Sequence, residues 1–190
     1  MGYKRIQDYG LIGDSHSAAL VGTDGSIDWC CFPRFDSPSV FAAILDDKKG
    51  GHFRIAPIES HEVHQEYLPN TNVLSTTFQT DEGEATLIDF MPLTEGSRPG
   101  QCPHEIHRIL TCTRGTMTME CRFQPRLDYG RAKTRVVAER NGAVASGNGY
   151  SLTLSSSIPL VVKQNQAKAR FVLEEGDECS FVVSYGRRRP

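Results

Sequence analysis

Residues 116–123 read TMTMECRF, and apolar and polar side chains alternate in this segment without a break. The apolar positions are Met117, Met119, Cys121 and Phe123. Successive side chains of a β-strand point to opposite faces, so the alternation predicts a strand with one face in a core and the other in water. A chain built from such strands has to pair them into sheets and cover one face of each sheet.

The same period recurs on both sides of turn signals. Three segments read as strand, turn, strand, and an Asp-Gly or Gly-Asp turn between alternating segments is typical of a β-hairpin. These segments are 17–32 around Asp24-Gly25, 72–91 around Asp81-Glu82-Gly83, and 170–185 around Gly176-Asp177. The further strand candidates are 51–56, 105–113, 133–139, 149–155 and 158–163.

One segment favours a helix. The DSP triplet at 36–38 offers an N-cap and a proline in the first turn, and Phe41, Ile44 and Leu45 follow at helical spacing. The glycine pair at 50–51 would end this helix. About a dozen short strands and one short helix predict an all-β fold, a large antiparallel β-sandwich.

The chain has the length and composition of one domain with a sizeable core. It contains 190 residues, no internal repeat and no low-complexity tract, which predicts a single β-sandwich domain over 1–186. The arginine-rich end, 187–190, reads as the start of a linker or a tail.

The net charge is −2 and no apolar run approaches about 20 residues. We therefore expect neither a nucleic-acid nor a membrane partner.

The cysteines and histidines do not show the spacing of a metal site. Six cysteines are scattered without a CxxC pair, which predicts buried, reduced thiols and hence a cytoplasmic protein. Two histidine pairs, one within 61–64 and one within 104–107, are three residues apart, a spacing that separates them to opposite faces of a strand. We expect no metal and no cofactor.

The chain also lacks the motifs of common catalytic sites. It has no phosphate-binding loop and no GxSxG nucleophile elbow. Its many aspartates stand mostly where turns and caps favour them, so a catalytic carboxylate pair is not indicated.

The segment 29–37 is the best candidate for a functional surface. It places the single tryptophan, Trp29, close to Pro33, Arg34, Phe35 and Asp36. Sugars are bound by aromatic rings together with carboxylates and the planar guanidinium of arginine. In that interpretation Trp29 or Phe35 stacks on a pyranose or wedges against a partner domain, and Asp36 either orients Arg34 or caps the following helix. A strand-to-helix turn requires the same residue types for purely local reasons, and a lone strand tryptophan is more often a core residue.

Several long segments resemble a known family. The stretch IQDYGLIGDSHSAALVGTDGSIDWCCFPRFDSPSVFAAILD at 6–46, followed by GGHF, is similar to the opening of bacterial-type glucoamylase/trehalase-like proteins of glycoside hydrolase family fifteen. The resemblance continues, in order, through YLPNTNVLSTTF at 67–78, GEATLIDFMP at 83–92 and FQPRLDYGR at 123–131.

The resemblance implies a non-catalytic role for this chain. In that family the region is an N-terminal β-sandwich that precedes a barrel of paired helices carrying both catalytic glutamates. The parent enzyme would hydrolyse α-glucosidic bonds, in trehalose or in maltose- and starch-type glucans, with inversion. No position here matches the catalytic motifs, so we expect no catalytic residue, a catalytic helical-barrel domain of the same protein as partner, and α-glucoside sugars as a further candidate partner.

Two alternatives remain open at this point. A stand-alone carbohydrate-binding module would carry an exposed row of aromatic side chains on one sheet face. A hydrolase acting through an aspartate pair would lose its activity in a panel of Asp→Asn variants.

Overall fold

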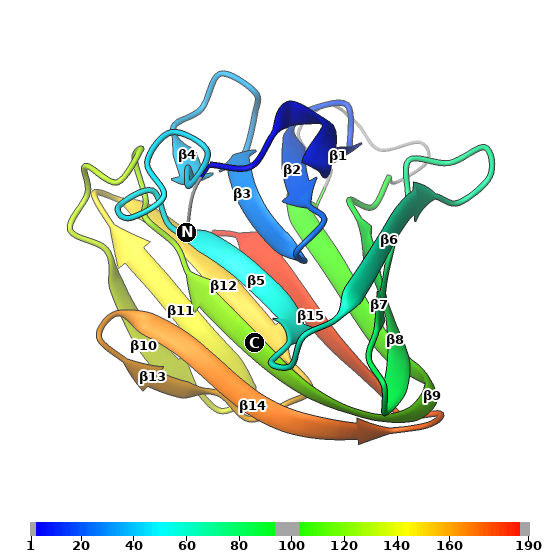
Figure 1. The fold of residues 1–190 in the computed structure, drawn as a ribbon. Helices are drawn as coiled ribbons and strands as arrows, with labels where there is room; N and C mark the ends of the chain where they lie inside the picture. Colours follow the sequence, from blue (N-terminus) through cyan, green and yellow to red (C-terminus); the bar gives the residue numbers. More distant parts are fainter. Residues whose placement is uncertain (1–2, 94–102, 187–190) are drawn as a thin grey trace.

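The structure is a computed structural model that describes residues 3–93 and 103–186, and in these residues it is an all-β sandwich of two antiparallel layers (Figure 1). The first layer consists of β1 (Tyr9–Gly13), β2 (Ala18–Gly22), β3 (Ser26–Cys31), β4 (Ser39–Phe41), β5 (His52–Pro57), β13 (Val161–Lys163) and β14 (Gln166–Glu174). The second layer consists of β6 (Glu62–Tyr67), β7 (Leu74–Gln79), β8 (Gly83–Phe90), β10 (Arg135–Glu139), β11 (Gly142–Gly147), β12 (Tyr150–Ser156) and β15 (Glu178–Tyr185). The long strand β9 (Glu105–Gln124) belongs to both layers.

The strand β9 joins the layers by changing partners along its length. Its first half pairs with β8 and β15, and its second half pairs with β5 and β14. The buried positions are even-numbered before the change and odd-numbered after it, with Gly115 at φ +65 between the two halves. A Cβ at Gly115 would lie 2.1 Å from the carbonyl oxygen of Glu82, so only glycine fits there. The predicted alternation over 116–123 is confirmed, and the separate strand predicted at 105–113 is the beginning of the same strand.

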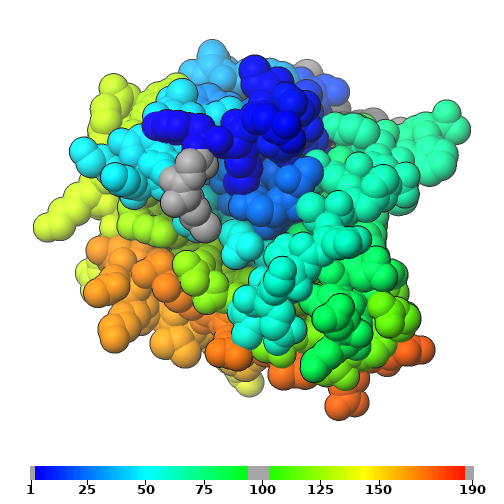
Figure 2. Space-filling model, in the orientation of Figure 1, coloured from blue at the N-terminus to red at the C-terminus, as the bar shows by residue number. Residues whose placement is uncertain are grey.

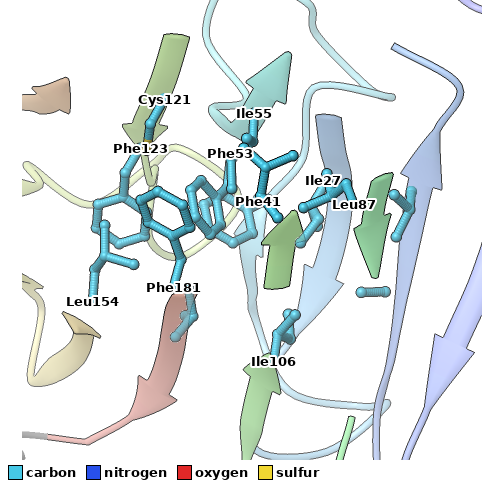
Figure 3. Close-up of a cluster of buried hydrophobic side chains, with 14 of the residues drawn as sticks. Ile27, Phe41, Phe53, Ile55, Leu87, Ile106, Cys121, Phe123, Leu154 and Phe181 are labelled. Atoms are coloured by element: carbon cyan, nitrogen blue, oxygen red, sulfur yellow. The ribbon is translucent and has the colours of Figure 1, made fainter. Parts of the chain in front are cut away.

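The core lies between the two layers and is rich in phenylalanine (Figure 3). Phe53 of β5 is fully buried, and its ring centroid lies 5.5 Å from that of Phe123, 6.5 Å from that of Phe41 and 6.3 Å from that of Phe181. Because Phe181 belongs to the second layer, these rings pack the two layers directly against each other.

A fully buried ion pair also crosses the core. Arg108 of β9 and Asp89 of β8 are both 0% exposed, with Arg108 Nε 2.7 Å and Nη2 3.0 Å from the carboxylate oxygens. The guanidinium also donates to the carbonyl oxygens of Phe53 at 2.7 Å and Gly25 at 2.8 Å, and it lies 4.8 Å from the centre of the Phe53 ring. One side chain of the second layer therefore satisfies two backbone carbonyls of the first layer.

The helix predicted over 36–45 is wrong. Ser39–Phe41 forms the short strand β4, in which Phe41 pairs with Cys30 and Ser39 with Cys31. Three consecutive buried residues gain more from this sheet pairing than the capping residues contribute to a helix. The chain then makes isolated turns up to Gly50, where a Cβ would lie 2.1 Å from the carbonyl oxygen of Ala42. Among the described residues the one helical element is the 3-10 turn η1 (Ile6–Asp8).

The predicted hairpin at 170–185 is right in its strands and wrong in its pairing. The segment contains most of β14 and all of β15, but these strands do not pair with each other. Instead β14 pairs with the second half of β9, and β15 pairs with the first half. The turn at Gly176, with φ +90, carries the chain from one layer to the other.

The other two hairpins are confirmed as β2–β3 and β7–β8. The remaining strand candidates correspond to β5, β10, β12 and the short β13. Strands β1, β6 and β11 were not among the predicted strands. The predicted tail at 187–190 lies outside the described residues.

The free edge of β1 is covered by side chains from the β6–β7 hairpin. The Tyr67 hydroxyl accepts a hydrogen bond from the Leu11 N–H at 2.7 Å and donates to the Leu11 carbonyl at 2.9 Å. Asn72 Nδ2 donates to the Gly13 carbonyl at 2.7 Å. These bonds occupy backbone groups that would otherwise offer a template for pairing with another chain.

We expect Tyr67→Phe to increase self-association, because it opens both Leu11 backbone groups without removing the aromatic ring. Sedimentation velocity over a concentration series measures the effect. The matched control is Tyr150→Phe, which removes a hydroxyl that bonds no described residue. Equal association of the two variants would contradict a protective role for Tyr67.

Candidate functional site

Trp29 lies on the outer face of the first layer. Leu20 pairs with Trp29 and Val21 with Ile27, so Asp28 is an extra residue in β3, a β-bulge. The bulge leaves Ile27 in the core and turns Trp29 outward, where it is half-buried. Its ring centroid lies 6.2 Å from that of Tyr129. Trp29 is therefore part of a surface and not of the core.

The loop after β3 is anchored by the buried ring of Phe32, whereas the ring of Phe35 is exposed. Phe32 is fully buried and precedes Pro33 through a cis peptide bond. Phe35 is 61% exposed, and its N–H donates to the His16 carbonyl at 2.9 Å. The loop backbone is thus fixed while the Phe35 ring is open to a partner.

Arg34 and Asp36 pair with each other in solvent. Arg34 Nε and Nη2 donate to the two carboxylate oxygens of Asp36 at 3.1 Å and 3.3 Å, and both side chains are exposed. Of the two roles considered for Asp36, orienting Arg34 agrees with this geometry, whereas capping does not, because no helix follows.

A second segment, for which the sequence predicted no functional surface, completes the surface. Tyr129 lies beside the loop, with its N–H donating to the Ser39 carbonyl at 3.3 Å and its hydroxyl to the Ser37 carbonyl at 3.4 Å. The Arg131 guanidinium lies 5.2 Å from the Tyr129 ring centre and forms an ion pair with Asp128. We call these two segments together the loop surface. Its members are Trp29, Arg34, Phe35, Asp36, Asp128, Tyr129 and Arg131.

The backbone of the loop surface is strained at two consecutive residues, as it also is at Gln164 and Asn165 in the turn between β13 and β14. Asp128 and Tyr129 have φ values of +56 and +55, which side chains other than glycine seldom adopt. Two consecutive residues of this kind cost about 1–3 kcal/mol each, and such strain is commonest at ligand and partner sites. In the sequence these residues belong to FQPRLDYGR, a segment that carries the family resemblance. Nothing local in this segment predicts that it packs on residues 37–39.

The loop that carries Arg34, Phe35 and Asp36 begins next to the end of β15, where the buried Phe32 packs. The Phe32 ring centroid is 6.3 Å from that of Tyr185 and 6.5 Å from that of His104. The N–H of Gly186 donates to the Ser151 carbonyl at 2.8 Å, which fixes the last described residue at this end of the sandwich.

A separate polar pocket of about 160 Å³ opens on the outer face of the first layer. Asp28 accepts hydrogen bonds from Tyr9 at 2.9 Å and Ser26 at 2.6 Å and is in contact with Lys4, which also bonds Asp24 at 2.8 Å. Burial, and next the charge of Asp28, raise the pKa of the Tyr9 hydroxyl above its ordinary value. In Figure 2 the N-terminal residues, in dark blue, lie across the residues of the 40s, in cyan, and the β2–β3 region, in blue.

The described residues form neither a catalytic triad around Asp14 nor a metal site. The Asp14 carboxylate accepts the backbone N–H groups of His16 at 2.9 Å and Ser17 at 2.7 Å, so these neighbours close a loop and form no catalytic triad. In residues 3–93 and 103–186 no three His, Cys, Asp or Glu side chains are arranged to hold a metal ion. The same residues contain no helix with the length and apolar composition that crossing a bilayer requires.

The cysteines behave as small core residues. The five within the described residues are buried and carry free thiols. Burial raises the pKa of Cys179 to about 12, which keeps its thiol protonated and unreactive. Cys102 lies outside the described residues.

Comparison with known proteins places the chain in a family. It is 32% identical to a trehalase of Thermoplasma volcanium over 97% of this chain, and 31% identical to a trehalase of Mycobacterium tuberculosis over 97% of this chain. It is 36% identical to Trehalase 1 of Sulfolobus acidocaldarius over 81% of this chain. The chain spans 30%, 30% and 26% of the length of these relatives. The family described as "Trehalase-like, N-terminal" matches residues 2–183, and the chain therefore belongs to the trehalase-like N-terminal domain family.

Proposed function

We propose that this chain is the non-catalytic N-terminal domain of a trehalase-type glycoside hydrolase, and that its loop surface docks on the catalytic domain. The parent would be an inverting hydrolase of family fifteen acting on α-glucosidic bonds, in trehalose or in glucoamylase-type substrates. The relatives are named trehalases and are more than three times as long as the matched region, which supports a catalytic domain in the same protein. The buried, free thiols support a cytoplasmic location.

The loop that carries Phe35 begins beside the end of β15, and this position is the observation that carries the docking proposal. A chain continuing beyond Gly186 starts next to Phe32, and the adjacent Phe35 is the most exposed ring of the loop surface. An exposed ring on a fixed backbone, with Arg34 and Asp36 as its chain neighbours, has the composition of an interface hot spot. From this position the loop surface would also reach the rim of the sugar site.

The first experiment is an immunoblot of source-cell extract with an antibody raised against this chain. A band far larger than 21.1 kDa supports the proposal. A band at 21.1 kDa would instead favour the stand-alone carbohydrate-binding module, and a glycan screen would follow.

In the longer protein we expect Phe35→Ala to lower activity on trehalose about 30-fold, which corresponds to the loss of one hot-spot side chain of ~2 kcal/mol. The same variant should split one cooperative thermal transition into two, because the domains no longer unfold together. The control is Val161→Ala, which removes an apolar side chain that is 70% exposed on β13. Unchanged activity and a single transition in Phe35→Ala would refute docking through the loop surface.

A further inference from the structure

The pocket on the outer face of the first layer contains polar groups that the protein itself does not use. Its two inner carboxylates, Asp24 and Asp28, are occupied by Lys4, Tyr9 and Ser26. These contacts hold the N-terminal segment against β3 and leave the outer part of the pocket open. The lining residues that remain include His52, Arg54 and Asp47.

These three side chains point free hydrogen-bonding groups into the pocket. The His52 ring and the Asp47 carboxylate bond no other described residue, and neither side chain is fully exposed. Arg54 uses Nε to donate to the Asp24 carbonyl at 3.1 Å, and its two terminal nitrogens donate to no described residue. Burial lowers the pKa of His52, so its imidazole is neutral near pH 7 and offers one donor and one acceptor.

The size and charge of the pocket restrict the ligand. A volume of about 160 Å³ is well below the ~300–1,000 Å³ of pockets for drug-sized molecules, which leaves room for a small ligand. The lining holds two cations, Lys4 and Arg54, against three carboxylates, Asp24, Asp28 and Asp47. The carboxylates repel an anion and the cations repel a metal ion, whereas mixed donors and acceptors suit a neutral polyhydroxyl molecule.

We propose that this pocket binds one neutral monosaccharide unit. Arg54 donates to adjacent hydroxyl groups through its planar fork, His52 donates and accepts one bond each, and Asp47 accepts from a hydroxyl. Tyr3 supplies an aromatic wall at the mouth, where its hydroxyl donates to the Leu45 carbonyl at 3.2 Å. This site is separate from the loop surface, and it exists whether or not that surface docks on another domain.

The test is an NMR titration of the ¹⁵N-labelled chain with D-glucose, with trehalose and with inorganic phosphate. We expect D-glucose in the millimolar range to shift the amide signals of Lys4, His52 and Arg54 and the His52 ring signals. Arg54→Met should weaken binding about tenfold through the loss of charge-assisted hydrogen bonds. The control, Arg170→Met, removes an exposed cation of β14 outside the pocket and should leave binding unchanged.

A second variant, His52→Phe, tests the proposal independently in case Arg54→Met does not fold. His52→Phe fills the pocket with a ring and should abolish the sugar response while the amide signals of the core remain. The proposal is overturned if sugar shifts no signal, if the shifts fall in residues 29–37 instead, or if Arg54→Met and Arg170→Met respond alike. A response to phosphate without a response to sugar would identify an anion site and overturn it as well.

Discussion

Asp89→Asn is expected to destabilise the fold by about 3–5 kcal/mol, because it leaves the charge of Arg108 buried without a counter-ion. Both side chains are 0% exposed, so water cannot replace the lost partner. Arg108→Met should cost a similar amount, since it also leaves the carbonyl oxygens of Phe53 and Gly25 without a donor. Urea unfolding followed by circular dichroism measures both variants.

The double variant separates the ion pair from the carbonyl contacts. With both charges removed, the loss should be clearly smaller than the sum of the single losses, by an interaction free energy of ~0.5–3 kcal/mol. The control is Arg122→Met, which breaks the partly exposed ion pair with Glu120 and should cost no more than ~1 kcal/mol. Single variants of Asp89 and Arg108 as mild as this control would contradict a structural role for the buried pair.

Phe53→Ala should cost about 3–5 kcal/mol, through the cavity it leaves and the transfer free energy of the lost ring. Phe53 contacts rings of both layers and the guanidinium of Arg108, so the cavity lies where the layers meet. Phe53→Leu should lose less, because most of the volume remains.

The matched control for this prediction is Phe35→Ala. Phe35 is 61% exposed, so in the chain without a partner domain its removal should change the free energy of unfolding by no more than ~0.5 kcal/mol. An equal loss at the two positions, measured in the same urea titrations, would mean that Phe53 is not central to the core.

The strands could be predicted because their signal is local. The alternation of apolar and polar residues over 116–123 is enough to predict a strand with one buried face. Turn residues in the sequence mark the hairpins β2–β3 and β7–β8. The pairing of β14 and β15 could not be predicted, because it depends on a strand that serves two layers. The helix over 36–45 failed for a related reason: its capping signal is local, whereas the pairing of Phe41 with Cys30 is tertiary.

The residues of the candidate site could likewise be predicted only in part from the sequence. Residues 29–37 stand out in the sequence by their aromatic and charged composition, and the structure exposes Arg34 and Phe35 and leaves Trp29 half-buried. Tyr129 joins them only because β9 ends beside β4, a relation over about ninety residues of chain. The pocket has no sequence signature, since pairing of β3 with β5 brings its residues together.

Because β9 is shared, the two layers form one cooperative unit. Losing the first half of β9 removes one of the two partners of β8 and of β15, and losing the second half removes one of the two partners of β5 and of β14. We therefore expect that neither layer opens while the other persists. Amide hydrogen exchange should therefore report the same opening free energy at residues 106–112 and 117–123, equal to that of global unfolding. In a longer protein such a unit would unfold in a single step under force or heat.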